Sequence, residues 1–175
     1  MTREGAGLGI RVGNSVRGQL RWLGLSAVLI ALDQWTKHLI ETHLDNLETR
    51  EILPVFDLVR AHNRGAAFSM FNNAGGWQRW AFSALALAVG AALITWLARL
   101  ERRAQLMAAA LALILAGALG NLIDRLRAGS VVDFLQLHWH EHYFPAFNVA
   151  DSTITVGAAL LLLDALLSSR QTSAR

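Results

Sequence analysis

The sequence consists of long apolar blocks separated by shorter polar segments. No charged residue occurs between Trp80 and Ala98, and none occurs between Ala104 and Ile123. An α-helix rises about 1.5 Å per residue, so roughly 20 such residues cross a hydrocarbon core about 30 Å thick. Two further blocks of similar length, nearer the ends of the chain, contain a few charged residues. We therefore predict four membrane helices, at about 20–40, 78–98, 104–124 and 148–168.

The first apolar block also has the composition of the hydrophobic region of a secretory signal peptide. Its core runs from Trp22 to Leu32, but no small-x-small cleavage site follows, and the chain continues as DQWTKHLI. We therefore interpret the block as an uncleaved first membrane helix. A basic tail over residues 1–19 precedes it.

Two polar segments, at about 41–77 and 125–147, join the predicted helices. Within the first, ILPVFDLVRAHN is rich in β-branched residues and partly alternating, which favours one or two strands. The run at 72–76 is typical of a loop. The second segment is predicted as a loop that carries Asp133. Residues 20–170 would then form a single membrane domain, followed by a short tail at 171–175.

The charges of the polar segments predict the orientation. Arginines gather in the N-terminal tail, in the 99–103 hairpin and in the C-terminal tail, whereas the 41–76 loop has five acidic and three basic residues. Cytoplasmic loops carry the excess of Lys and Arg in membrane proteins. The expected fold is an all-α integral membrane protein with four transmembrane helices and both termini cytoplasmic. A small β-containing periplasmic segment would lie between the first two helices.

The composition excludes several classes of function. The chain has 175 residues, of which 54% are hydrophobic and 17% charged, and it contains no cysteine. Disulfides, thiolate metal sites and cysteine nucleophiles are therefore excluded. The formal net charge is +3, but the arginines lie at the edges of the apolar blocks and form no basic stripe. This pattern argues against nucleic-acid binding.

Three aspartates, Asp124, Asp133 and Asp151, lie where the last two predicted helices meet the outer loop. A carboxylate at a helix centre in lipid costs roughly 2.5–3.5 kcal/mol, so acids near the membrane indicate a function. Two facing carboxylates in a partly dry site share a proton, and such a pair can activate water while it polarises a carbonyl. No basic residue adjoins Asp133 or Asp151, which favours these two as the catalytic pair.

Polar residues at helical spacing accompany the aspartates. Asn121, Asp124 and Arg125 stand at i, i+3 and i+4 near the end of the third predicted helix. Asn148 and Asp151 stand at i and i+3 at the start of the fourth. Because the outer loop joins these helices, the two polar faces can meet. For Asp124, an ion pair with the adjacent arginine is the simpler interpretation.

Two other groups of polar residues have a structural interpretation. Asp33 and Lys37 stand at i and i+4 with the acid first, which favours a buried ion pair. His138, His140 and His142 would lie on one side of a strand, but no HExxH motif is present and no outer ligand shell is visible. We therefore predict no metal site.

These residues alone leave three functions open. An aspartyl peptidase would use a carboxylate pair at the outer surface. A small proton-coupled transporter would relay protons through Asp33, Asp124 and Asp151, although the acids cluster on one side and do not cross the bilayer. A non-catalytic assembly factor would tolerate replacement of both aspartates of the pair by asparagine.

Five short motifs in one order resemble the lipoprotein signal peptidase family, also called signal peptidase II. They are DQWTK (33–37), NRGAAFS (63–69), GNLIDR (120–125), GSVVDF (129–134) and FNVADSTITVG (147–157). The resemblance implies a membrane aspartyl endopeptidase that removes the signal peptide from diacylglyceryl-modified prolipoproteins, on the N-terminal side of the lipidated cysteine. It also implies a multi-pass protein of the bacterial cytoplasmic (inner) membrane with its active site on the periplasmic side.

The same resemblance assigns roles to individual residues. Asp133 and Asp151 match the catalytic pair of the family. Positions matching substrate-binding or supporting residues are Asn63, Gly65, Asn121, Asp124, Arg125 and Asn148. Asp33 and Lys37 match structural polar positions. We expect no cofactor or metal, and a monomer in contact with membrane lipid and its prolipoprotein substrate. The position and size of the 41–76 segment lead to a separate hypothesis, in which this segment closes over an extended substrate as a lid or cradle and residues 63–69 contact the substrate.

Overall fold

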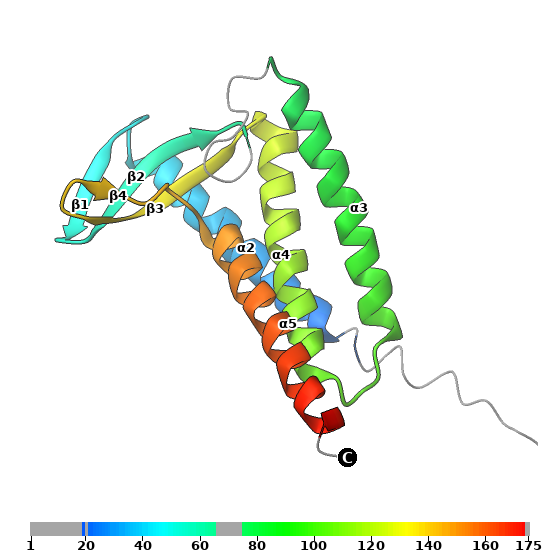
Figure 1. Ribbon diagram of the computed structural model, residues 1–175. Helices are drawn as coiled ribbons and strands as arrows, with labels where there is room; N and C mark the ends of the chain where they lie inside the picture. Colours follow the sequence, from blue (N-terminus) through cyan, green and yellow to red (C-terminus); the bar gives the residue numbers. More distant parts are fainter. Residues whose placement is uncertain (1–18, 20, 66–74, 174–175) are drawn as a thin grey trace, which may run out of the picture.

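The computed structural model describes residues 19, 21–65 and 75–173, and this part of the chain forms a helical bundle with a small sheet at one end (Figure 1). The helices are α2 (Arg21–His43), α3 (Trp77–Arg99), α4 (Gln105–Ala128) and α5 (Val149–Ser173). The strands are β1 (Thr49–Leu53), β2 (Phe56–Asn63), β3 (Val131–Trp139) and β4 (His142–Tyr143). Residues 1–18 of the predicted basic tail and residues 66–74 of the first polar segment lie outside the described residues.

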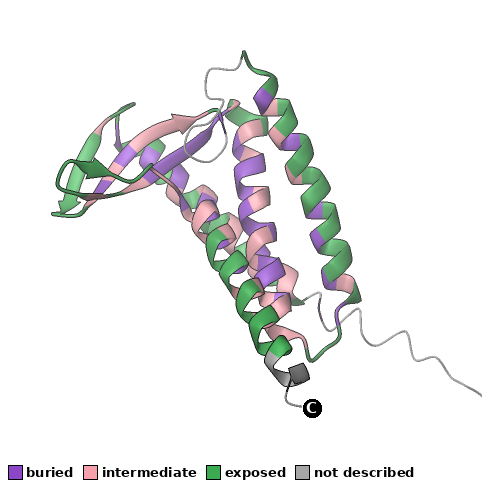
Figure 2. Cartoon of the chain, viewed as in Figure 1, coloured by how far each residue is buried: buried purple, intermediate pink, exposed green. Residues whose placement is uncertain are grey.

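Helix α4 is the centre of the bundle and packs against α2, α3 and α5. Its buried face is built largely from small residues, among which Ala108 and Ala110 are fully buried. Figure 2 shows the contrast with α3 and α5, whose outer faces are exposed. Those outer faces carry large apolar side chains, including Leu85, Leu87 and Leu162. An apolar outer surface of this kind suits contact with lipid rather than water.

Glycines set how closely α4 and α5 approach each other. A Cβ atom added at Gly117 would lie 2.2 Å from the carbonyl oxygen of Ala150. One added at Gly157 would lie 2.8 Å from the carbonyl oxygen of Ala110. Such contacts are too short for any side chain, so these positions require glycine. Small residues of this kind allow membrane helices to pack backbone to backbone.

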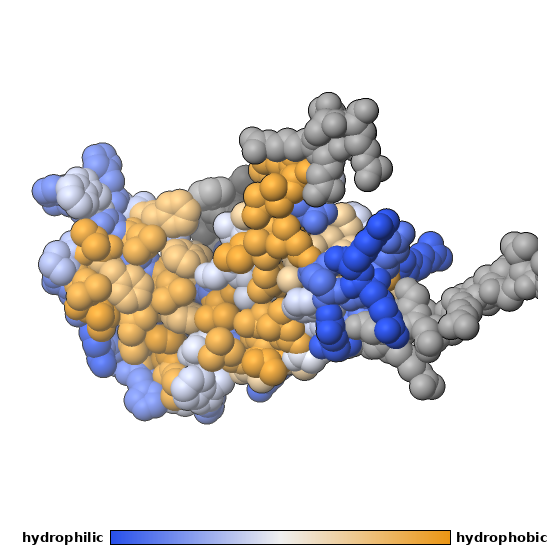
Figure 3. All heavy atoms as spheres, turned by 90° about the horizontal axis from the view of Figure 1, so that it is seen from below, coloured by the Kyte–Doolittle hydropathy of each residue, from blue (hydrophilic) through white to orange (hydrophobic). Residues whose placement is uncertain are grey.

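Three described helices are long and apolar enough to cross a membrane: α3, α4, and α5 from Val149 to Ser169. Helix α2 has 23 residues, but Asp33 and Lys37 interrupt its apolar sequence. Figure 3 views the molecule from the end that holds the α3–α4 connection and shows a broad apolar surface around the helices. The structure thus confirms a mostly helical, membrane-type protein.

The sheet is antiparallel and has the strand order β1–β2–β3–β4. Strands β1 and β2 come from the segment in which the sequence predicts strands. Strands β3 and β4 come from the 125–147 segment, for which the loop prediction is wrong. VVDFLQLHW forms β3 because its first four residues are buried at the junction with the helices. The fold is therefore not all-α, and Asp133 lies on a strand.

The buried part of β3 joins the sheet to the bundle. Val132 and Phe134 pack against Ile40 and Leu44, at the end of α2. In Figure 1 the rest of the sheet extends sideways from this junction. The first residues of β3 are therefore held rigidly beside the ends of α2 and α4.

Candidate active site

Asp133 and Asp151 are held by one buried residue, Asn148. Its side-chain amide nitrogen donates to Asp133 Oδ1 at 2.7 Å, and its backbone N–H donates to Asp151 Oδ2 at 3.2 Å. In return, Asn148 Oδ1 accepts from the backbone N–H of Asp151 at 2.9 Å. These reciprocal bonds form a capping box at the start of α5. The cap that begins the helix therefore also ties the two aspartates together.

The remaining carboxylate oxygens are bound by two other asparagines. Asn63, the last residue of β2, donates from Nδ2 to Asp133 Oδ2 at 3.1 Å. Asn121 on α4 donates from Nδ2 to Asp151 Oδ1 at 2.8 Å. Every oxygen of the two carboxyl groups therefore accepts at least one N–H bond. The site draws on β2, β3, α4 and α5, so distant parts of the chain build it.

Asp133 is 4% exposed, and its burial has a clear effect on proton binding. Burial, followed by the negative charge of Asp151, raises the pKa of Asp133 from 3.8 to about 7. Hydrogen bonds from Asn63 and Asn148 and the charge of Lys37 act in the opposite direction. Because Asp151 is one cause of the raised pKa, the value describes the pair rather than Asp133 alone. Near neutral pH the pair can hold one proton.

A buried ionic network lies beneath the aspartate pair. Lys37 Nζ is 2.8 Å from Asp33 Oδ2 and 2.7 Å from Asp124 Oδ2. The predicted ion pair between Asp33 and Lys37 is thus present. The prediction that Asp124 pairs with its neighbour Arg125 is wrong, because the partner of Asp124 comes from α2. A side chain on a different helix cannot be identified from spacing along one helix.

Asp33 also holds the start of α5. Its Oδ1 accepts the backbone N–H of Ala150 at 2.9 Å, while its other oxygen binds Lys37. A Cβ atom at Gly120 would lie 2.7 Å from Asp33 Oδ2, so glycine leaves the room for this carboxylate. Gln34 belongs to this network but is not predicted from the sequence, and its Nε2 donates to Asp124 Oδ1 at 2.8 Å. Its position beside Asp33, three residues before Lys37, was the available indication.

Arg125 and Gly65 lie next to each other at the edge of the site. Arg125 Nη2 donates to the Gly65 carbonyl oxygen at 3.2 Å, and the guanidinium group lies over the ring of Phe82. The backbone N–H of Gly65 donates to Asn63 Oδ1 at 2.9 Å, so this turn also fixes Asn63. Of the expected lid residues at 63–69, those from 66 onward lie outside the described part of the chain.

The three histidines of the outer segment do not share one side of a strand, contrary to the prediction. His138 is on β3 and His142 on β4, and His140 lies in the turn between them with a φ of 51°. The His138 ring stacks on Tyr143, and its Nε2 is 3.5 Å from Asp57 Oδ1. Among the described residues, no group of three His, Cys, Asp or Glu side chains could hold a metal ion.

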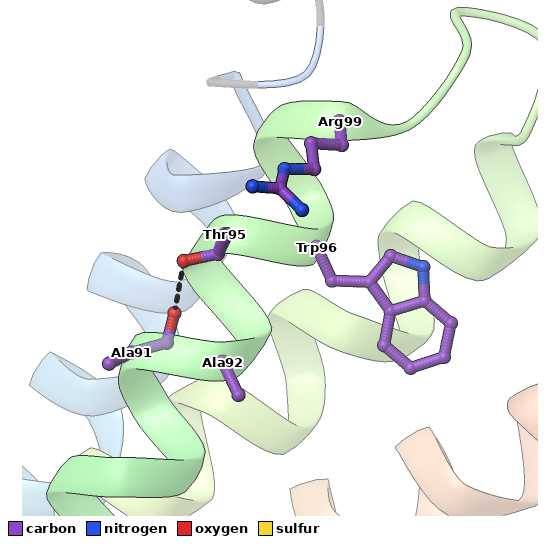
Figure 4. A pocket seen from close by; sticks show the side chains of 5 residues that line it. All are labelled: Ala91, Ala92, Thr95, Trp96 and Arg99. Atoms are coloured by element: carbon purple, nitrogen blue, oxygen red, sulfur yellow. Dashed lines mark hydrogen bonds between the residues drawn. The ribbon is translucent and has the colours of Figure 1, made fainter.

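A surface hollow on α3 lies away from the aspartates and is lined by no acidic residue. Ala91, Ala92, Thr95, Trp96 and Arg99 line it (Figure 4). The Thr95 hydroxyl donates to the Ala91 carbonyl oxygen at 2.7 Å, within the helix itself. No carboxylate lines this hollow, and it is near the opposite end of the bundle from the start of α5. The candidate active site is therefore the aspartate pair.

Comparisons with known proteins agree on one family. The model of the family described as signal peptidase II matches residues 25–167. A lipoprotein signal peptidase of Acinetobacter baylyi is 49% identical over 152 residues, which are 87% of this chain and 85% of that protein. One of Teredinibacter turnerae is 47% identical over 156 residues, which are 89% of this chain and 93% of that protein.

Solved structures give the same result at the level of the fold. A structure described as a bacterial membrane enzyme superposes with a TM-score of 0.77 at 28% identity, and the match covers 85% of this chain and 89% of that one. A second structure of the same description has a TM-score of 0.73 at 29% identity. An enzyme is thus favoured over the transporter and the assembly factor. This multi-pass bacterial membrane protein belongs to the signal peptidase II family of proteases.

Proposed function

We propose that this protein is an aspartyl endopeptidase in which Asp133 and Asp151 are the catalytic pair. Its substrates are diacylglyceryl-modified prolipoproteins, from which it removes the signal peptide on the N-terminal side of the lipidated cysteine. The observation that carries the proposal is the joint binding of both carboxyl groups by Asn148. The raised pKa of Asp133, about 7, supports it because a working pair needs one proton at neutral pH.

The chemistry follows from one shared proton. The ionised carboxylate takes a proton from a water molecule, whose oxygen then bonds to the carbonyl carbon of the scissile peptide. The protonated carboxyl group gives its proton to the carbonyl oxygen, which produces a gem-diol. The pair then returns a proton to the leaving nitrogen as the C–N bond breaks. The products are the carboxyl terminus of the signal peptide and the free amino group of the lipidated cysteine.

The surrounding residues bind the substrate or support the pair. Asn63, Asn121 and Asn148 keep the two carboxyl groups oriented through the bonds described above. We assign Arg125 and Gly65 to substrate binding, because Arg125 is close enough to Asp133 and Asp151 to interact with their charges and donates to the Gly65 carbonyl oxygen. Asp124 supports the site through Lys37. An extended substrate is required because a helix hides its carbonyl groups within its own hydrogen bonds.

We place four spans in the membrane, with α2 as the first. The two charged side chains in the middle of α2 support this placement, since Asp33 is 1% and Lys37 2% exposed and both therefore face protein. Its outer face carries large apolar side chains, namely Val28, Leu32, Trp35 and Leu39. The membrane domain would then comprise residues 20–170, with one tail before it in the sequence, at 1–19, and one after it, at 171–175.

The arginine-rich segments support a topology with both termini in the cytoplasm and the aspartates on the outer side of the bacterial inner membrane. A lipid-modified substrate stays in the bilayer, so its scissile bond is presented near the outer interface.

We take the working unit to be a monomer, because all the side chains of the proposed site come from one chain. The lid formed by the 41–76 segment remains part of the proposal.

The proposal predicts that cleavage depends on the lipid. The purified full chain, reconstituted in phospholipid, is given two precursors that differ only in the diacylglyceryl group on the cysteine. We expect the lipidated precursor to be cut on the N-terminal side of that cysteine and the unmodified one to be left intact. Mass spectrometry of the products gives the cut position. Equal cleavage of both precursors, or a cut elsewhere, would contradict the proposed specificity.

A further inference from the structure

Lys37 is the only lysine in the chain, and its ammonium group is buried. It contacts three oxygen acceptors: Asp33 Oδ2 at 2.8 Å, Asp124 Oδ2 at 2.7 Å and Asn121 Oδ1 at 3.0 Å. An ammonium group has three N–H donors, so these contacts use all of them. Two of the acceptors are carboxylates that neutralise the charge. The third acceptor, the amide of Asn121, is neutral and is itself hydrogen-bonded to Asp151 of the proposed catalytic pair.

The contact between Lys37 and Asn121 sets the direction of the Asn121 amide. Asn121 Oδ1 accepts from Lys37 and, at 3.3 Å, from Asn148 Nδ2. Its Nδ2 must therefore point the other way, where it donates to Asp151 Oδ1 at 2.8 Å. A flipped amide would place its NH₂ group against the ammonium group and its oxygen against a carboxylate. Both contacts would be repulsive, so the charge of Lys37 holds the amide in the donating orientation.

We propose that Lys37 is a positioning residue for the aspartate pair. It keeps Asn121 oriented as a donor to Asp151, and its buried positive charge sets the pH range in which the pair holds one proton. This inference rests on the proposed function, because it assigns Lys37 a task only if the pair is catalytic. It also gives the ionic network a role beyond stability.

Several charged groups surround Lys37 and the pair and contribute to that pH range. They are Asp33 on α2, Asp124 and Arg125 on α4, Asp151 on α5 and Asp133 on β3. The charge of Lys37 lowers the pKa of Asp133 and so opposes the effect of burial. Removal of Lys37 should therefore have the opposite effect to removal of one of its carboxylate partners.

The test measures single-turnover cleavage of a lipidated precursor against pH for the reconstituted full chain. Lys37→Met removes the charge and keeps most of the length of the unbranched side chain. We expect both limbs of its pH–rate profile to move to higher pH by about 1 unit. Its maximal rate should fall because Asn121 can flip, and its KM should stay unchanged because Lys37 does not touch the substrate.

Asp124→Asn is the variant matched to Lys37→Met, because it removes a negative charge from the same ion pair. It leaves Lys37 paired with Asp33, so we expect the limbs to move to lower pH. A purely structural role would change the amount of folded protein in both variants without moving the limbs. Limbs that stay in place in both variants would therefore overturn the proposal. If Lys37→Met does not accumulate, Asp124→Asn decides alone: a shift to lower pH supports the proposal, and no shift overturns it.

Two further variants distinguish a wrong role for Lys37 from a wrong catalytic pair. Asp133→Asn and Asp151→Asn are measured in the same assay. If either cleaves the precursor at the wild-type rate, the catalytic pair itself is wrong. If both are inactive while Lys37→Met and Asp124→Asn keep the wild-type pH limbs, only the assignment of Lys37 fails.

Discussion

Replacement of Asp133 or Asp151 by asparagine is expected to lower the rate of prolipoprotein cleavage by about 10²- to 10⁴-fold, the usual contribution of positioned acid and base groups. Asparagine keeps the shape of the side chain but can neither take a proton from water nor hold the shared proton. A gel-shift assay on a lipidated precursor measures the loss. Both variants should still insert into the membrane, because asparagine keeps the size of the side chain and its amide oxygen still accepts one of the two N–H bonds that each carboxyl group receives.

Asp164→Asn is the matched control for this prediction. It makes the same substitution on α5, in the second half of the helix, whereas Asp151 is in the first turn. We expect cleavage at the wild-type rate. Normal processing by Asp133→Asn or Asp151→Asn would contradict the pair. Loss of activity in all three variants would instead indicate a general effect of the substitution on the membrane domain.

Substitution of Asn148 should have the second-largest effect, since this residue joins the two aspartates. Its side chain is fully buried, and its Nδ2 donates to Asp133 and to the Val132 carbonyl oxygen. We expect Asn148→Ser to lower the rate of cleavage by roughly 10- to 100-fold, because a hydrogen bond to a charged group contributes about 1.5–3 kcal/mol. Serine is too short to reach Asp133 but can still cap α5.

Asn148→Ala separates the two roles of this residue. Alanine loses both the bond to Asp133 and the cap, so its activity should match that of Asn148→Ser. Its free energy of unfolding should be lower than that of Asn148→Ser by about 1 kcal/mol, the typical value of an N-cap. Thermal unfolding in detergent measures this difference. Recovery of activity in Asn148→Ser alone would show that only the helix cap matters.

The sequence predicts the long helices well because uninterrupted apolar blocks leave few alternatives. It also predicts the ion pair of Asp33 and Lys37, whose partners are one helical turn apart. Two features of the site escaped prediction for physical reasons. The sequence predicts a loop at Asp133, because a strand buried at a helix junction shows no clear alternation in its first residues. The contact between Lys37 and Asp124 depends on how α2 and α4 pack.

Packing between helices also decides the bonds around Asn148. The i, i+3 spacing of Asn148 and Asp151 indicates a shared face and, in the structure, forms the capping box. The bond from Asn148 to Asp133 depends on where β3 lies, which no local pattern reports. The close approach of α4 to α5 at Gly117 likewise becomes visible only in three dimensions. Local pattern therefore predicts elements and motifs, and packing determines their partners.

In the proposed mechanism, Asp133 and Asp151 share one proton near neutral pH. Infrared spectroscopy measures this directly, through the carbonyl stretch of a protonated carboxyl group followed against pH. Because the pKa of Asp133 is raised from 3.8 to about 7, the wild type should keep one such band until the pH rises through about 7. Asp133→Asn should lack it. Titration of every aspartate near the ordinary pKa of 3.8, or an unchanged band in Asp133→Asn, would contradict the shared proton.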